Sequence, residues 1–194
     1  MYSCFRLIII LLLMAFVCSG FGLAQAAQEF EAGDRLPELQ LEYPEQEQWI
    51  SYLGLESEQE SFSLGQIQGR ILVLQIFSMY CPVCQKEAPE VNQLFDLLQE
   101  QGLQDSIKLL GLGAGNTKLE VEVFQEKFQV EFPLFADSDY EQYDIFGEVG
   151  TPFFLVLEAG SDQPRILFTH LGELESPEDF LQRIREAGEE MRLD

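Results

Sequence analysis

Basic side chains are scarce in this sequence. Its 194 residues include 11 lysines and arginines against 34 aspartates and glutamates, a formal net charge of −23. A nucleic-acid binder needs a surplus of cations to neutralise phosphates, so this balance excludes that class of protein. The charge also disfavours contact with anionic membrane surfaces. Solubility is the main explanation that we give for the acidity, and attraction of a basic partner is the second.

Histidine and cysteine are also rare. The single histidine, His170, is distant in sequence from the cysteines, and a structural zinc site needs four ligands. We therefore expect neither a metal site nor a bound cofactor. Two of the four cysteines, Cys4 and Cys18, fall in the apolar N-terminal stretch, which leaves Cys81 and Cys84 for the remaining chain. That remainder has no internal repeat and is long enough for one domain with its own core.

The N-terminal segment has the layout of a secretory signal peptide. Arg6 is the only charged residue among the first 28, residues 7–17 are continuously apolar, and Ala24-Gln25-Ala26 offers a small-x-small cleavage site. The apolar stretch is close to spanning length, so an uncleaved membrane anchor stays open as the alternative. We expect residues 1–26 to form this leader, residues 27–194 to form a single domain, and the protein to be exported to a periplasmic or other extracytoplasmic space.

The most informative motif is a pair of cysteines two residues apart, Cys81-Pro82-Val83-Cys84. It follows an apolar run, Ile71–Phe77, and precedes a stretch with helical periodicity. A helix N-terminus carries about half a positive charge, which favours a thiolate and lowers the pKa of the first cysteine below its free value. Pro82 suits the first helical position, where no N–H is needed. The spacing places both sulfurs on one helix face, where they can form a disulfide.

Hydrophobic periodicity predicts strands that alternate with helices. Short apolar runs indicate buried strands at residues 71–77 and 107–112, and two further strands at 153–157 and 165–171 are joined by a turn. A short extended segment is expected at residues 132–135. This order predicts an α/β sandwich whose mixed central sheet is flanked by helices.

Capping residues locate the helices between these strands. The first helix begins at the cysteine pair and ends near Gly102, and the last begins at Ser176-Pro177. A short helix is expected to be capped by Ser138 and Glu141. Thr117 and Glu120 predict a capping box for the second long helix. We expect the core-facing stripe of that second helix to consist of Leu119, Val123, Phe124 and Phe128.

Two further segments have less specific patterns. The acidic, glutamine-rich segment 42–61 is polar enough to be a loop or insertion, although Trp49 and its apolar neighbours indicate that part of it packs. Gly111 to Gly115 reads Gly-x-Gly-x-Gly, but it lacks the third glycine at dinucleotide spacing. We therefore assign these glycines to a turn at the end of a strand.

On these residues the chain resembles the thioredoxin superfamily, and within it the exported thiol–disulfide oxidoreductases of the TlpA/ResA type. The resemblance runs from about residue 33 to residue 188. It rests on the strand that leads into Cys81-Pro82-Val83-Cys84, on Glu87 after the second cysteine, and on Pro89, eight residues after Cys81. It also rests on Gly150-Thr151-Pro152 before a strand, which is similar to the family's cis-proline loop. The resemblance implies a thioredoxin-like three-layer sandwich.

The resemblance also implies roles for individual residues. Cys81 would attack a partner's disulfide and Cys84 would resolve the mixed disulfide, so that a redox-active Cys81–Cys84 disulfide takes the place of a cofactor. Glu87, one helical turn beyond Cys84, would exchange the proton of that thiol. Substrate contacts would come from the residues around the dithiol and in the cis-proline loop, namely Tyr80, Pro82, Thr151 and Pro152.

This sequence departs from the family pattern at two positions. Tyr80 stands where the family often has tryptophan, and Gln75 occupies the strand position where cytoplasmic thioredoxins keep a buried acid. The acid's role in deprotonating the second cysteine would therefore fall to Glu87. For His170 we expect a structural role.

The expected function is that of an exported protein-disulfide oxidoreductase. The resemblance favours a reductase of disulfide-containing proteins that receives electrons from a membrane donor and acts as a monomer. A peroxiredoxin-like thiol peroxidase is an alternative, although Ser78 stands where those enzymes usually have threonine. A non-catalytic binding module and a carrier of a soft ion such as Cu(I) also stay open.

Overall fold

The computed structural model describes residues 30–56, 59–147 and 149–191. The expected leader, residues 1–26, lies outside the described residues. Within the described part of the chain, no helix is both long enough and apolar enough to cross a membrane.

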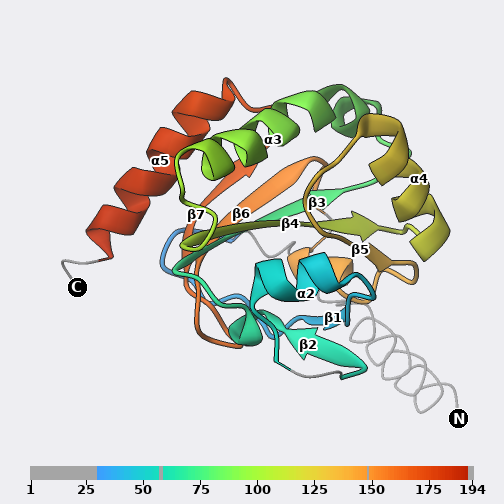
Figure 1. The fold of residues 1–194 in the computed structure, drawn as a ribbon, viewed down its shortest axis with the longest axis horizontal. Helices are drawn as coiled ribbons and strands as arrows, with labels where there is room; N and C mark the ends of the chain where they lie inside the picture. The colour runs from blue at the N-terminus through green and yellow to red at the C-terminus, as the bar shows by residue number, and fades with distance from the viewer. Residues whose placement is uncertain (1–29, 57–58, 148, 192–194) are drawn as a thin grey trace, which may run out of the picture.

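Five strands form the central sheet in the order β5-β4-β3-β6-β7 (Figure 1). Strand β3 is parallel to β4, and β4 is parallel to β5, whereas β6 runs antiparallel to both β3 and β7. The mixed sheet expected from the sequence is therefore confirmed. The strand bounds are Ile71–Phe77 for β3, Ile107–Ala114 for β4, Leu134–Asp137 for β5, Phe153–Glu158 for β6 and Ile166–Leu171 for β7.

Both faces of this sheet are covered, which gives the molecule three layers (Figure 1). One face carries α3 (Pro82–Glu100), α4 (Lys118–Phe128) and α5 (Pro177–Glu190). The other face carries a two-stranded sheet of β1 (Gln40–Glu42) and β2 (Ser61–Ser63), the helix α2 (Glu47–Leu53) and the 3-10 turns η1 (Leu64–Gln66) and η2 (Tyr143–Phe146).

Strand β3 shows why the sequence selects this arrangement. Val73 and Phe77 pack beneath the helices of one layer, while Leu72 and Leu74 pack into the core on the opposite side. Every residue of the strand is buried, including its one polar residue, Gln75, as expected for a run that is otherwise apolar. Full burial of one such aliphatic side chain stabilises the fold by about 2 kcal/mol. The strand is thereby fixed at the centre of the sheet, and its C-terminal end carries the cysteine motif.

The core-facing stripe predicted for α4 is partly wrong. Leu119 and Val123 are 68% and 44% exposed, and the buried residues are Val121 and Phe124. Each helical residue turns the side chain by about 100°, so Leu119 and Val123 share a side that faces away from Phe124. The ring of Phe124 stacks on Phe77 with 4.7 Å between centroids, and this contact fixes which side of α4 meets the sheet. The capping box at the start of the helix is confirmed.

The short helix expected after Ser138 is confirmed at its end but not at its start. It is the 3-10 helix η2, which begins only at Tyr143 and ends at Phe146, as the sequence indicates. The carboxylate of Asp137, at the end of β5, accepts hydrogen bonds of 2.8 and 3.1 Å from backbone N–H groups at the start of this turn. The expected caps, Ser138 and Glu141, are thus replaced by a buried acid that precedes both of them.

Segment 42–61 is built into the domain through α2. The backbone N–H of Leu109 donates a hydrogen bond of 2.8 Å to the hydroxyl of Tyr52. Strand β5 pairs only with Gly111–Ala114 of β4, so the tyrosine satisfies an N–H group on the part of the β4 edge that β5 leaves uncovered. Burial raises the pKa of Tyr52, and its ring also lies 4.8 Å from the ammonium of Lys108.

The glycines of the Gly-x-Gly-x-Gly motif occupy two environments. Gly111 and Gly113 lie inside β4, which corrects their assignment to a turn. A Cβ atom on Gly111 would lie 2.5 Å from a methyl group of Leu134, so the absence of a side chain allows close packing of β5. Gly115 does form a turn, with φ of +63°.

Candidate active site

The cysteine motif lies where β3 passes into α3. A tight turn closes with a hydrogen bond of 3.0 Å from the N–H of Cys81 to the carbonyl of Ser78. Cys81 is then the N-cap of α3, and its sulfur accepts a hydrogen bond of 3.2 Å from the backbone N–H of Cys84. Pro82 occupies the first helical position, as the sequence predicts. The first sulfur therefore lies at the positive end of the helix dipole.

This environment favours the ionised form of Cys81. Partial burial acts to raise its pKa, but hydrogen bonds outweigh that effect. Side-chain hydrogen bonds with Cys84 and Thr151 and backbone hydrogen bonds with Cys84 and Val83 bring the pKa of Cys81 below its ordinary value. Since a thiolate is the nucleophilic form of cysteine, Cys81 is suited to attack.

The second cysteine has the opposite character. Cys84 lies on the buried face of α3, and both cysteines are free thiols in this structure. Burial, together with the hydrogen bond to Cys81, raises the pKa of Cys84 to about 12. The pair thus combines a partly accessible, acidic thiol with a buried thiol that holds its proton.

The Thr151-Pro152 loop lies against the first cysteine. The peptide bond between these residues is cis, as the resemblance implies. The sulfur of Cys81 lies 3.3 Å from the carbonyl oxygen of Thr151, although 70 residues separate them in sequence. Strand β6 begins immediately after the loop and runs antiparallel to β3, so the sheet brings the loop to the end of β3 that carries the cysteines.

Glu87 lies in α3 three residues after Cys84, and both side chains are buried. Its carboxylate accepts a hydrogen bond of 2.7 Å from the backbone N–H of Leu174, in the loop before α5. Burial raises the pKa of Glu87 above its ordinary value, while this hydrogen bond partly opposes the shift. The carboxyl group is therefore held in one position and protonates more readily than an exposed glutamate.

The residues expected to contact substrate lie at the surface of the motif. Tyr80 is 65% exposed, and its hydroxyl hydrogen-bonds to the carboxylate of Glu120 in α4. That hydrogen bond raises the pKa of Tyr80. Pro82 and Val83 are also exposed, so the outer side of the dithiol presents apolar groups to solvent.

Two amide side chains at this site were not identified from the sequence. Asn116, two residues after the end of β4, accepts a hydrogen bond of 2.8 Å from the backbone N–H of Met79. Gln85, in α3, donates one of 2.7 Å to the carbonyl of the same residue. Gln85 follows the second cysteine directly and could have been considered. Asn116 comes 32 residues after Cys84 and carries no local signal of its position.

Gln75 and His170 both pack against neighbouring parts of the fold. Gln75 is buried in β3 between Gly111 and Phe154 of the neighbouring strands. His170 lies against the ring of Phe180, and its Nε2 atom is 2.8 Å from the carbonyl oxygen of Glu173. These contacts agree with the structural role expected for the histidine.

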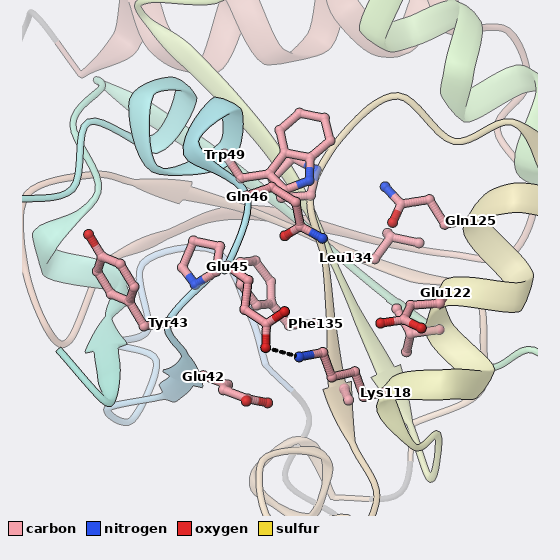
Figure 2. Close-up of a pocket in the computed structure, with 14 residues that line it drawn as sticks. Glu42, Tyr43, Glu45, Gln46, Trp49, Lys118, Glu122, Gln125, Leu134 and Phe135 are labelled. Atoms are coloured by element: carbon pink, nitrogen blue, oxygen red, sulfur yellow. Dashed lines mark hydrogen bonds and ion pairs between the residues drawn. The ribbon is translucent and has the colours of Figure 1, made fainter. Parts of the chain in front are cut away.

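No group of three or more histidine, cysteine, aspartate or glutamate side chains in the described ranges is arranged to hold a metal ion. A pocket lies elsewhere, between α2, β5 and α4, and Figure 2 shows its lining. Trp49 borders it, and an exposed ion pair between Lys118 and Glu45 crosses it. Neither cysteine and no residue of the cis-proline loop lines this pocket.

The fold and the site together define a thioredoxin-like protein with a dithiol at the start of a helix. Residues 32–168 match the AhpC/TSA family, and the chain belongs to that family. Similar curated proteins include the thiol-disulfide oxidoreductase ResA of Halalkalibacterium halodurans, 24% identical over 72% of this chain and 76% of that protein. ResA of Bacillus thuringiensis is 24% identical over 79% of this chain and 80% of that protein.

Solved structures agree with this fold. A protein from Chlorobium tepidum described as a thiol:disulfide interchange protein DsbE superposes with a TM-score of 0.61 at 17% identity. The match covers 82% of this chain and 99% of that one. StoA from Bacillus subtilis superposes with a TM-score of 0.51 at 23% identity, over 64% of this chain and 88% of that one. The thioredoxin-like architecture expected from the sequence is confirmed.

Proposed function

We propose that this protein is an exported thiol–disulfide oxidoreductase that reduces disulfides in other proteins through Cys81 and Cys84. The observation that carries the proposal is the placement of the Cys81 sulfur, which lies 3.2 Å from the N–H of Cys84 and 3.3 Å from the carbonyl of Thr151. The names of the ResA relatives support the same class of reaction.

The proposed reaction has two exchanges. The Cys81 thiolate attacks one sulfur of a substrate disulfide, forming a mixed disulfide and releasing the other substrate sulfur as a thiolate. Cys84 then loses its proton and attacks the Cys81 sulfur. This second exchange forms the Cys81–Cys84 disulfide and releases the remaining substrate sulfur. The substrate gains two electrons and the protein loses two, so a further reductant must regenerate the dithiol.

Glu87 is the proposed acceptor of the Cys84 proton. A thiol whose pKa is about 12 needs a base to become a nucleophile near neutral pH. Glu87 lies one helical turn away within the same buried layer, and burial raises the pKa of its own carboxyl group. A carboxylate with a raised pKa is a better base than an exposed one, which supports this role.

The proposed substrate site combines the cis-proline loop with the exposed side of the motif. An extended segment of the substrate would pair with the backbone of Thr151, and Tyr80 and Pro82 would contact its side chains. Pro152 would hold the loop in position. Export through the N-terminal segment, action as a monomer and supply of electrons by a membrane protein complete the proposal.

The test is reduction of a model disulfide protein by the reduced chain. Substitution Cys81→Ser should abolish turnover, and Cys84→Ser should accumulate a mixed disulfide that is detected by mass. The midpoint potential of the Cys81–Cys84 couple distinguishes the two directions, because a reductase should have a potential well below that of a strong oxidant of the DsbA kind, about −120 mV. Turnover by Cys81→Ser at the wild-type rate would contradict the assignment.

A thiol peroxidase is the second candidate, because peroxiredoxins share this scaffold and the AhpC/TSA match leaves that reaction open. The contacts at the sulfur argue against it: among the residues that the structure describes, the groups that shift the pKa of Cys81 are Cys84, Thr151 and Val83, and none of these is an arginine. Consumption of hydrogen peroxide by the reduced protein, measured beside disulfide reduction, separates the two reactions.

A further inference from the structure

Besides its backbone hydrogen bond from Cys81 to Ser78, the turn before Cys81 is held by two side chains. After β3 ends at Phe77, the backbone of Met79 lies outside the ladder of the sheet and before the first turn of α3. Met79 is partly buried, and a backbone polar group that is shielded from water without a partner costs about 1–3 kcal/mol, so partners for its N–H and its carbonyl stabilise the turn. Asn116 and Gln85 supply these partners at 2.8 and 2.7 Å.

Asn116 connects three parts of the site. Its side chain is 0% exposed, its Oδ1 atom accepts from Met79, and its Nδ2 atom donates to the hydroxyl of Ser78 over 3.4 Å. Its own backbone carbonyl accepts a hydrogen bond from the N–H of Asp137, at the end of β5. The residue therefore ties the turn to the ends of two neighbouring strands.

Gln85 holds the same turn from the helix. It lies in the first turns of α3, where its backbone N–H donates to the carbonyl of Cys81 over 3.1 Å. Its side chain reaches back to Met79, so one residue fixes both the helix start and the turn before it. The backbone of Met79 is therefore hydrogen-bonded on both sides, by Asn116 after β4 and by Gln85 in α3.

We propose that Asn116 and Gln85 are positioning residues that hold Met79 from both sides and thereby set the orientation of the Cys81 sulfur toward the N–H of Cys84 and the loop at Thr151. This proposal rests on the proposed function, because the two amides would position the same dithiol that carries out the exchange. Without either amide the turn gains freedom, and the sulfur spends less time in the geometry that stabilises its negative charge. The thiolate fraction and the midpoint potential should both change.

The chain offers matched controls for both residues. Asn92 is an amide in α3 that donates to the backbone carbonyls of Phe128 and Gln129, and Gln125 in α4 donates to those of Val130 and Phe132. Asn92 joins α3 to the C-terminal end of α4, and Gln125 joins α4 to the loop that follows it; none of their partners belongs to the cysteine motif. Loss of either control amide should therefore affect stability without changing the sulfur.

The experiment compares Asn116→Ala and Gln85→Ala with Asn92→Ala and Gln125→Ala in the full reduced chain. Alkylation of Cys81 is followed against pH, and the midpoint potential and the unfolding free energy are measured for each variant. We expect Asn116→Ala and Gln85→Ala to raise the pKa of Cys81 by about half a unit, a roughly three-fold loss of thiolate below the pKa. The two control variants should titrate like the wild type.

The outcomes are distinguishable from those of the proposed function. If all four variants share the wild-type pKa and potential, the positioning role is overturned, even where the wild type reduces disulfides. If the wild type fails to reduce a model disulfide, the proposed function fails, while the shift in pKa still tests the positioning role. Gln85 is only partly buried, so Gln85→Ala provides the test should Asn116→Ala not fold.

Discussion

The backbone N–H of Cys84 donates a hydrogen bond to the sulfur of Cys81 across 3.2 Å. The two cysteines are unequal, because this contact stabilises a negative charge on the first sulfur, whereas burial on the inner face of α3 keeps the second protonated. The reaction proposed for this site depends on that inequality.

Replacement of Glu87 by glutamine should slow the second exchange. The amide keeps an acceptor for the N–H of Leu174 but cannot take a proton from Cys84. We expect turnover to fall on the order of a hundred-fold, the lower end for a positioned proton-transfer group, with alkylation of Cys81 unchanged. Stopped-flow reduction of a model disulfide measures the effect. Glu90→Gln, at an exposed position of the same helix, is the matched control and should keep the wild-type rate.

The same substitution should change how stability depends on pH. The folded state raises the pKa of Glu87 above its ordinary value of 4.5, so the fold favours the protonated form. Its contribution is complete below the unfolded pKa and is lost as pH rises through the higher folded pKa. Urea unfolding at several pH values should show this loss in the wild type and in Glu90→Gln, and its absence in Glu87→Gln. Equal pH slopes in all three proteins would show that burial of Glu87 is not linked to its titration.

Removal of the Tyr80 ring should weaken the reaction with protein substrates only. The ring is 65% exposed beside the dithiol, where a docked polypeptide would cover it. We expect Tyr80→Ala to lower kcat/KM for a disulfide protein about five-fold and to leave the reaction with a small aromatic disulfide unchanged. Tyr80→Phe keeps the ring and loses only the hydrogen bond to Glu120, so it should resemble the wild type in both assays. An equal loss of kcat/KM with both substrates would show that Tyr80 affects the reactivity of the Cys81 sulfur and not the docking of a protein substrate.

Loss of the Tyr52 hydroxyl should destabilise the fold. In Tyr52→Phe the buried N–H of Leu109 has no acceptor, at a cost of about 1–3 kcal/mol. Tyr43→Phe is the control, because that hydroxyl is exposed and donates to a backbone carbonyl at the surface. Its substitution should cost less than about 0.5 kcal/mol. Equal unfolding free energies for the two variants would contradict the structural role that we give to α2.

The sequence predicts those parts of the site whose residues form a recognisable local motif. The strand Ile71–Phe77, the cysteine motif and Thr151-Pro152 each carry their own signal, and the structure brings the last two within 3.3 Å. Asn116 has no such signal, because its partner Met79 is 37 residues away and meets it only when β3 and β4 pair in parallel.

Errors in the predicted elements have similar causes. Leu119 and Val123 look like core residues by composition, but the stacking of Phe124 on Phe77 turns them toward solvent. The cap of η2 comes from Asp137 at the end of a strand, a tertiary contact that the pattern around Ser138 does not reveal. In both cases contacts between segments that are distant in sequence determine the result, namely which side of α4 is buried and which residue caps η2.

The most direct test is the pH dependence of alkylation of each cysteine in the reduced full-length protein, with the modified residue located by mass. The account predicts that Cys81 reacts first and titrates below the ordinary thiol value of 9.0, while Cys84 resists modification until the pH approaches its pKa of about 12. Equal rates at both cysteines, or a pKa of Cys81 at or above 9.0, would contradict the account.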